Sequence, residues 1–137
     1  MATLTPTLTL VSTDVFTDSL NLSVTDSLSV LGVSKRFTVV VDSSETELYT
    51  DGNLILAAAD YTKSYVYFKN KSSTAAEIIT LGVADNDGSG DDALETTNMS
   101  LGAGEFAFYP WDSSLDIVAD AASGTPVLDV MVFQAAA

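Results

Sequence analysis

The carboxylates that crowd residues 85–92 are the side chains in this sequence best suited to metal chemistry. Oxygen-bearing side chains occupy every second position there: Asp85, Asp87, Ser89 and Asp91. Calcium takes such oxygen ligands, and Gly90 stands where a helix–loop–helix calcium loop makes its sharp turn. The twelfth position of such a loop is Thr96, however, and the acid falls one residue early at Glu95. We therefore expect an acidic surface loop without metal, with calcium binding as the alternative.

Two residue types that carry much of enzyme chemistry are missing from the sequence. Without His there is no imidazole base, no Ser-His pair and no imidazole metal ligand. Without Cys there is no thiolate nucleophile, zinc-thiolate site, iron–sulfur cluster or disulfide. A carboxylate pair of the kind that hydrolyses glycosides stays open in a chain with 19 acids, but no two acids stand out. We predict no enzyme activity, no catalytic residue, no metal and no cofactor.

The segment from Lys63 to Lys71 is predicted to be an amphipathic strand. Its even positions are Ser64, Val66, Phe68 and Asn70. The odd positions place Tyr65 and Tyr67 on the same side as the lysines, among them Lys69. Tyr supplies contact area and hydroxyls, while Lys meets an acidic neighbour, which in this case includes a second copy of the chain. The interpretation that we favour is a solvent-facing strand whose lysines protect a sheet edge, and the binding face is the alternative.

The last predicted strand, residues 127–133, is apolar on both faces. Its even positions are Leu128, Val130 and Val132. On the other face Val127, Met131 and Phe133 are interrupted only by Asp129. This pattern predicts either a central core strand or a strand whose second face is covered by another subunit, which favours a homo-oligomer. The candidate interface residues are Tyr65, Tyr67, Lys69, Lys71, Met131 and Phe133.

An aromatic cluster follows Gly104. We expect Phe106 and Phe108 to face the core, with Ala107 and Tyr109 on the other side. Pro110 is expected to end the strand, and Trp111 to begin the next corner. These rings are therefore predicted to anchor the core. A sugar-stacking platform is the alternative, but it needs the aromatic rings of this segment exposed together. The alternation argues against exposure for two of its four rings, which are Phe106, Phe108, Tyr109 and Trp111.

The chain is strongly acidic, with 5 Lys+Arg against 19 Asp+Glu and a formal net charge of -14 at pH 7. All five basic residues precede residue 72. Phosphate contacts need Lys and Arg in number, so we expect no nucleic-acid partner. The longest uninterrupted apolar run, Leu54 to Ala59, is far too short for a membrane span, and the start lacks the pattern of a secretory signal. We expect no membrane partner.

Period-two alternation recurs along the chain, whereas sustained helical spacing does not. This pattern, with turn clusters between roughly eight to ten short segments, predicts an all-β protein: an antiparallel β-sandwich or jelly-roll-like single domain. Residues 1–33 are thinner in apolar content and are predicted to form an extended N-terminal arm on a compact body over 34–137. The string Thr-Asp-Ser-Leu occurs at 17–20 and again at 25–28, which predicts a duplicated short strand unit in the arm.

Several segments together resemble small virion structural proteins of marine tailed bacteriophages, those of cyanobacteria in particular. They are the Ser-Leu-rich repeat, Lys35-Arg36-Phe37 with the strand that follows, the strand Ser64 to Lys71, the corner Leu101 to Trp111, and the closing strand 127–133. The similarity spans most of the chain and rests on a pattern of strands and corners. The acidic segment 85–92 is not part of it.

The resemblance implies a non-enzymatic building block of a virus particle, assembled in the host cytoplasm and located in the virion. The expected role is that of a capsid decoration, or cement, protein that binds and stabilises the phage head by multivalent protein–protein contacts. Its partners would then be capsid or other virion proteins. The alternatives are a tail or fibre component, or a carbohydrate-binding or adhesive β-sandwich module.

Overall fold

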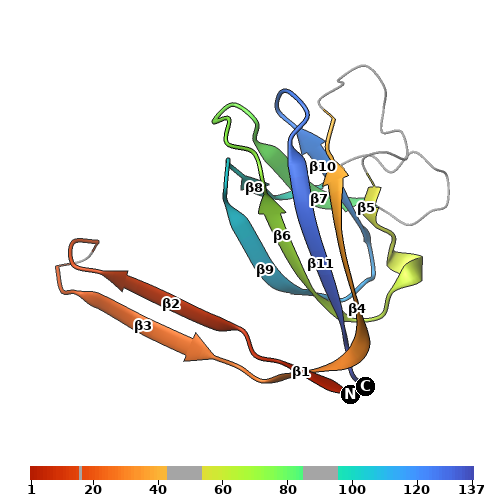
Figure 1. Cartoon of the computed structure of the whole chain (residues 1–137), viewed down its shortest axis with the longest axis horizontal. Helices are drawn as coiled ribbons and strands as arrows, with labels where there is room; N and C mark the ends of the chain where they lie inside the picture. Colours follow the sequence, from red (N-terminus) through yellow and green to blue (C-terminus); the bar gives the residue numbers. More distant parts are fainter. Residues whose placement is uncertain (16, 43–53, 85–95) are drawn as a thin grey trace. The chain divides into compact units, whose positions relative to one another are not determined.

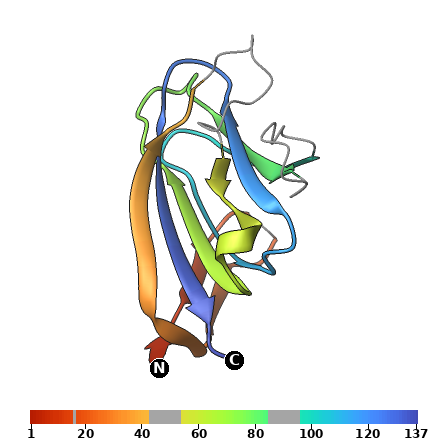
Figure 2. The same ribbon diagram turned by 90° about the vertical axis from the view of Figure 1, so that its right-hand side faces the viewer.

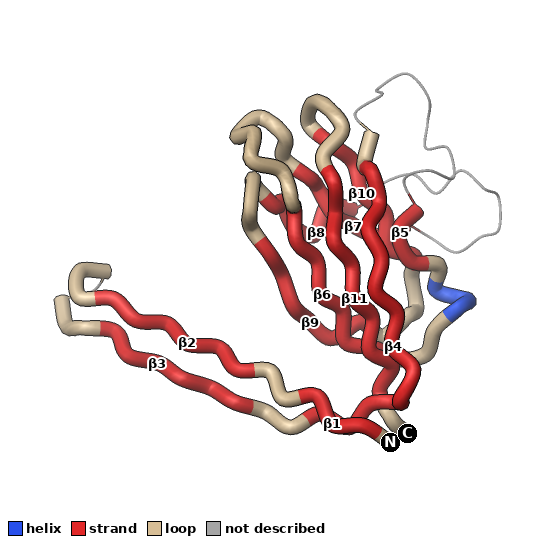
Figure 3. Tube along the Cα trace, in the orientation of Figure 1, coloured by secondary structure: helices blue, strands red, loops and turns tan. Residues whose placement is uncertain are grey.

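The chain folds almost entirely into β-strands. A computed structural model describes residues 1–15, 17–42, 54–84 and 96–137. Within these ranges the one helical element is a single 3-10 turn, η1 (Ala58–Asp60), as Figure 3 shows. The strands pair in antiparallel sheets, which confirms the predicted all-β class. Among the described residues, no helix has the length and apolar character that crossing a bilayer requires.

Contacts divide the chain into two units, Met1–Gly32 with Ala135–Ala137, and Val33–Gln134. The first unit holds β1 (Ala2–Leu4), β2 (Thr7–Ser12), β3 (Leu20–Thr25) and the start of β4 (Leu28–Val40), labelled in Figure 1. β1 pairs with the first residues of β4, and β2 pairs with β3 in a two-stranded hairpin. Pro6 cannot donate to a ladder and lies between β1 and β2.

The second unit is a sandwich of two four-stranded sheets. One has the order β4-β11-β6-β9 and the other the order β5-β10-β7-β8. The strands not yet defined are β5 (Leu54–Leu56), β6 (Ser64–Asn70), β7 (Ile79–Ala84), β8 (Thr96–Leu101), β9 (Phe106–Trp111), β10 (Asp116–Ala121) and β11 (Val127–Ala135). Figure 2 shows β4, β11 and β6 side by side in one layer. The predicted sandwich is thereby confirmed.

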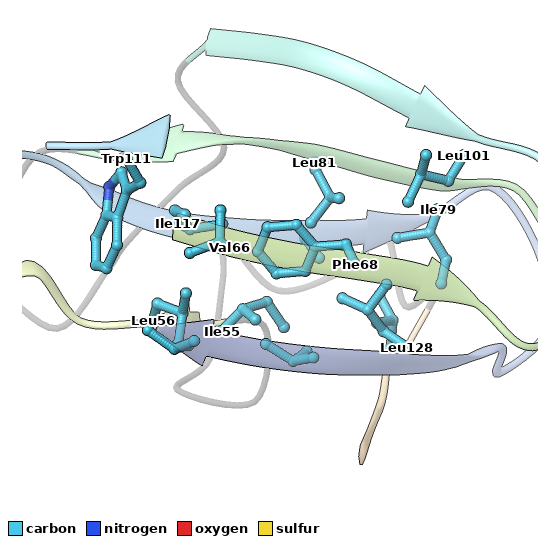
Figure 4. Close-up of a cluster of buried hydrophobic side chains, with 14 of the residues drawn as sticks. Ile55, Leu56, Val66, Phe68, Ile79, Leu81, Leu101, Trp111, Ile117 and Leu128 are labelled. Carbon is cyan, nitrogen blue, oxygen red and sulfur yellow. The ribbon is translucent and has the colours of Figure 1, made fainter. Parts of the chain in front are cut away.

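The core lies between these two sheets. From β6 and β11 it receives the even positions, with Val66, Phe68 and Leu128 fully buried. Ile79 and Leu81 approach from the opposite sheet, as Figure 4 shows. Because side chains alternate along a strand, this inward set fixes which residues of β6 and β11 point away from the core.

Tyr109 on β9 packs its ring beside Phe68, with the ring centroids 6.0 Å apart. Burial raises the pKa of Tyr109 to about 12, above its value in an unfolded chain. Between pH 10 and 12 the unfolded chain therefore loses this proton more readily than the folded one, and stability falls as the pH rises. We expect Tyr109→Phe to remove about 1 kcal/mol of that decline at pH 11. Urea unfolding at pH 8 and pH 11 measures it, with Tyr65→Phe as the control. A decline as steep in Tyr109→Phe as in the parent would contradict the assignment.

Candidate functional site

The side of the β4-β11-β6-β9 sheet that points away from the core carries a block of aromatic and apolar side chains. The strand registers arrange it in three rows across β11, β6 and β9. These rows, which we call the outer face, are Asp129–Lys69–Phe106, Met131–Tyr67–Phe108 and Phe133–Tyr65–Pro110. Residues directly opposite each other on one face of a sheet are within contact distance, so the block is continuous.

The four rings at the centre of the outer face form two stacked pairs. Tyr65 and Phe108 have ring centroids 6.3 Å apart and an interplanar angle of 14°. Tyr67 and Phe106 have centroids 6.1 Å apart and an angle of 29°. Both pairs are diagonal neighbours across the β6–β9 ladder. Phe106 is 63% exposed and Phe108 is 37% exposed, while the two tyrosines are half-buried. Contiguous exposed apolar surface is typical of interaction sites, so this block is the candidate functional site.

Charged groups lie at one end of the outer face. Asp129 is only 7% exposed, and its carboxylate accepts hydrogen bonds from the Arg36 guanidinium of β4, at 3.2 Å from Nη2 and 3.5 Å from Nε. Lys69 stands directly opposite Asp129 on β6. Two bases and one acid therefore border the rings, in a chain whose net charge is -14. The buried carboxylate is compensated by neighbours of opposite sign.

The structure places five of the six candidate interface residues on this one face: Tyr65, Tyr67, Lys69, Met131 and Phe133. The sixth, Lys71, follows the end of β6 and is exposed, and its backbone N–H donates to the Val127 carbonyl at 2.8 Å. β6 lies between β11 and β9 in its sheet. The expectation that the lysines protect a sheet edge is therefore wrong, because β6 is not an edge strand.

The structure corrects the expectation for β9. Phe106 and Phe108 point outward, whereas Tyr109 and Trp111 face the core. The buried indole decides the phase of the strand, since its Nε1 donates to the Leu115 carbonyl at 3.1 Å. The expectation that Pro110 ends the strand is also wrong. β9 is the edge of its sheet, where a residue without an N–H can remain in a strand.

The predicted alternative of a calcium site has no counterpart among the described residues. Residues 85–92, the candidate calcium loop, lie outside the described residues. Elsewhere in the described ranges, no cluster of three or more acidic side chains is arranged to hold a metal ion. The outer face thus offers rings, a thioether and few charges, which suit contact with another surface.

No protein-family model matches this chain, and the searches of curated proteins and of solved structures find no match either. The outer face is therefore defined by the strand registers, exposures and ring contacts of this chain itself.

Proposed function

We propose that this protein works by adhesion, binding another protein through its outer face, and that it does so as a capsid decoration protein of a phage head. The observation that carries the proposal is that two stacked pairs of aromatic rings lie on one sheet face, each with an exposed phenylalanine. The cores of protein–protein interfaces are enriched in Tyr, Phe, Met and Arg and depleted in most charged residues. The outer face and the adjoining Arg36 have this composition.

The virion part of the proposal is supported by the resemblance of the strand and corner segments to phage structural proteins. A decoration protein needs neither reactive groups nor deep pockets, because many copies bind a repeated surface and each contact adds to the whole. A high net charge of one sign also keeps the free protein soluble before it assembles. A tail or fibre position would use the same face.

Purified phage particles from the source of this sequence test the proposal. We expect quantitative mass spectrometry to find the chain in many copies per head. We also expect recombinant protein to rebind to particles from which it has been stripped. In Phe106→Ser/Phe108→Ser rebinding should be at least tenfold weaker, because each substitution removes an exposed ring from the face. The matched control is Leu115→Ser, which removes an apolar side chain of similar exposure, 39%, between β9 and β10.

Two results would contradict the proposal. If the chain is absent from purified particles, the proposed role in the virion is wrong. If Phe106→Ser/Phe108→Ser rebinds with unchanged affinity, the outer face is not the contact surface.

A carbohydrate-binding module is the second candidate, and one observation favours it. The rings of Tyr65, Tyr67, Phe106 and Phe108 lie together on the surface, so the alternation no longer argues against a sugar-stacking platform. The rings pair with one another, however, which leaves less ring face for a sugar. A glycan array separates the two candidates, since protein adhesion predicts no glycan bound above background.

A further inference from the structure

The β2–β3 hairpin has an apolar face that nothing covers in the described structure. Leu8 lies opposite Val24, and Leu10 lies opposite Leu22. These four side chains are between 41% and 52% exposed. The opposite face of the hairpin is mainly polar, with Thr7 opposite Thr25 and Thr9 opposite Ser23. The hairpin is therefore a two-stranded sheet with one aliphatic face.

Such a hairpin needs a partner surface for stability. A two-stranded sheet alone is at best marginally stable in water, and packing against a further apolar surface is what stabilises it. Neither strand of the hairpin contains a charged residue, although the chain carries 24 charged side chains. The hairpin can consequently be buried against another surface without taking a charge out of water.

Acids flank the hairpin at both ends. Asp18 precedes β3 and Asp26 follows it, so the two carboxylates are separated by eight residues. The repeated string Thr-Asp-Ser-Leu produces this spacing, since each copy supplies one of the two acids. Both residues are exposed. At about 3.3 Å per residue, the acids lie on the order of 27 Å apart when the intervening chain is extended.

Bases flank the central strand of the outer face with the same spacing. Lys63 precedes β6 and Lys71 follows it, again eight residues apart, and both are exposed. Within the described ranges the one ion pair is that between Arg36 and Asp129. A hairpin laid along β6 would bring an acid to a base at each end, with its aliphatic face against the aromatic rows. Residues 1–32 contain three acids and no Lys or Arg, so the complementarity of charge holds for the whole segment.

We infer that the outer face of one copy of this chain binds the β2–β3 hairpin of a second copy, rings against aliphatic side chains, with Asp18 and Asp26 meeting Lys63 and Lys71. The inference rests on the proposed function and deepens it, because the protein that the outer face binds on the particle is then the neighbouring copy of this chain. Such a contact joins two different surfaces. Each copy therefore offers a free hairpin and a free outer face, and the assembly grows into a ring or a chain.

Complementation between two full-length variants tests the contact. Leu10→Thr/Leu22→Thr disables the hairpin face, and Phe106→Thr/Phe108→Thr disables the outer face, while Thr preserves strand propensity. In sedimentation velocity we expect the parent to assemble and each variant alone to associate at least tenfold more weakly. An equimolar mixture should regain the parental affinity and stop at two chains, because only one working contact remains. Val11→Thr, on the other face of the hairpin, is the control and should assemble like the parent.

Charge reversal provides a second test in which the apolar surfaces are left intact. Asp18→Lys/Asp26→Lys and Lys63→Glu/Lys71→Glu should each weaken assembly several-fold, and combining all four substitutions in one chain should restore it. A parent that stays monomeric at about 100 µM would overturn the inference. So would an equimolar mixture of the two disabled variants that remains monomeric, or charge reversals without effect.

The same variants separate this inference from the proposed function. If the outer-face variant loses assembly or particle binding while the hairpin variant retains both, the face binds another protein, and only the inference fails. If the outer-face variant retains both, the proposed function fails as well.

Discussion

Replacing Phe68 by alanine is expected to lower the free energy of unfolding by about 4 kcal/mol. Phe68 is the largest of the fully buried side chains, and it lies at the centre of the core between the two sheets. Removing its ring forfeits the burial of that surface and leaves a cavity that close-packed neighbours fill only in part. Small domains are stabilised by only about 5–15 kcal/mol, so this loss is a large fraction of the total.

Phe106→Ala is the matched control, because it makes the same chemical change on the opposite side of the same sheet. With 63% of Phe106 exposed, we expect a loss of about 1 kcal/mol or less. Urea denaturation of both variants, followed by far-ultraviolet circular dichroism, measures the two losses. Equal losses would contradict the assignment of inward and outward faces. If Phe68→Ala is too unstable to measure, Phe68→Leu retains the order of the two effects.

Replacing Asn70 by alanine should cost about 3 kcal/mol, although the side chain is polar. Asn70 is fully buried at the end of β6. Its Nδ2 donates to the carbonyl oxygens of Glu77 at 2.7 Å and Leu101 at 3.0 Å, and its Oδ1 accepts from the Ser72 N–H at 3.0 Å. One side chain thus ties the end of β6 to the segment before β7 and to the end of β8. Alanine leaves the buried Leu101 carbonyl and the partly buried Glu77 carbonyl without this donor.

Asn70→Asp discriminates between loss of volume and loss of the donor. Aspartate keeps an acceptor for Ser72 but has no N–H for the two carbonyls, so at neutral pH we expect a loss at least as large as that in Asn70→Ala. Asn98→Ala is the control, because Asn98 is exposed on β8. Thermal and urea unfolding give the comparison. A destabilisation by Asn70→Asp no greater than that of Asn98→Ala would show that the two donor bonds contribute little.

Much of the fold is encoded in simple alternation. The alternation over Lys63 to Lys71 predicts β6 to within one residue at each end, and it assigns Val66 and Phe68 to the same, inward face. The two-sided apolar pattern of 127–133 likewise identifies β11, which lies between β4 and β6. Alternation works for these strands because one of their faces is packed into the core, which fixes their phase.

The rest depends on contacts between residues far apart in the chain. β8 was not predicted, since Thr96 to Leu101 has few apolar residues and lies at a sheet edge. On β9 large rings occupy both phases, so hydrophobicity alone could not choose between Phe106 and Tyr109 as inward residues. The segment Leu54 to Ala59 combines a short strand with the beginning of η1. The outer face as a whole appears only when the registers of β11, β6 and β9 align its rows.

We expect the outer face to be covered when the protein performs its role. Hydroxyl-radical footprinting measures this at each side chain, in the free chain at a concentration low enough for it to be monomeric and in the chain bound to particles. Modification of Phe106, Phe108 and Met131 should fall several-fold on binding, while that of Leu115 should be unchanged. Equal modification of these outer-face residues in the two states would contradict it.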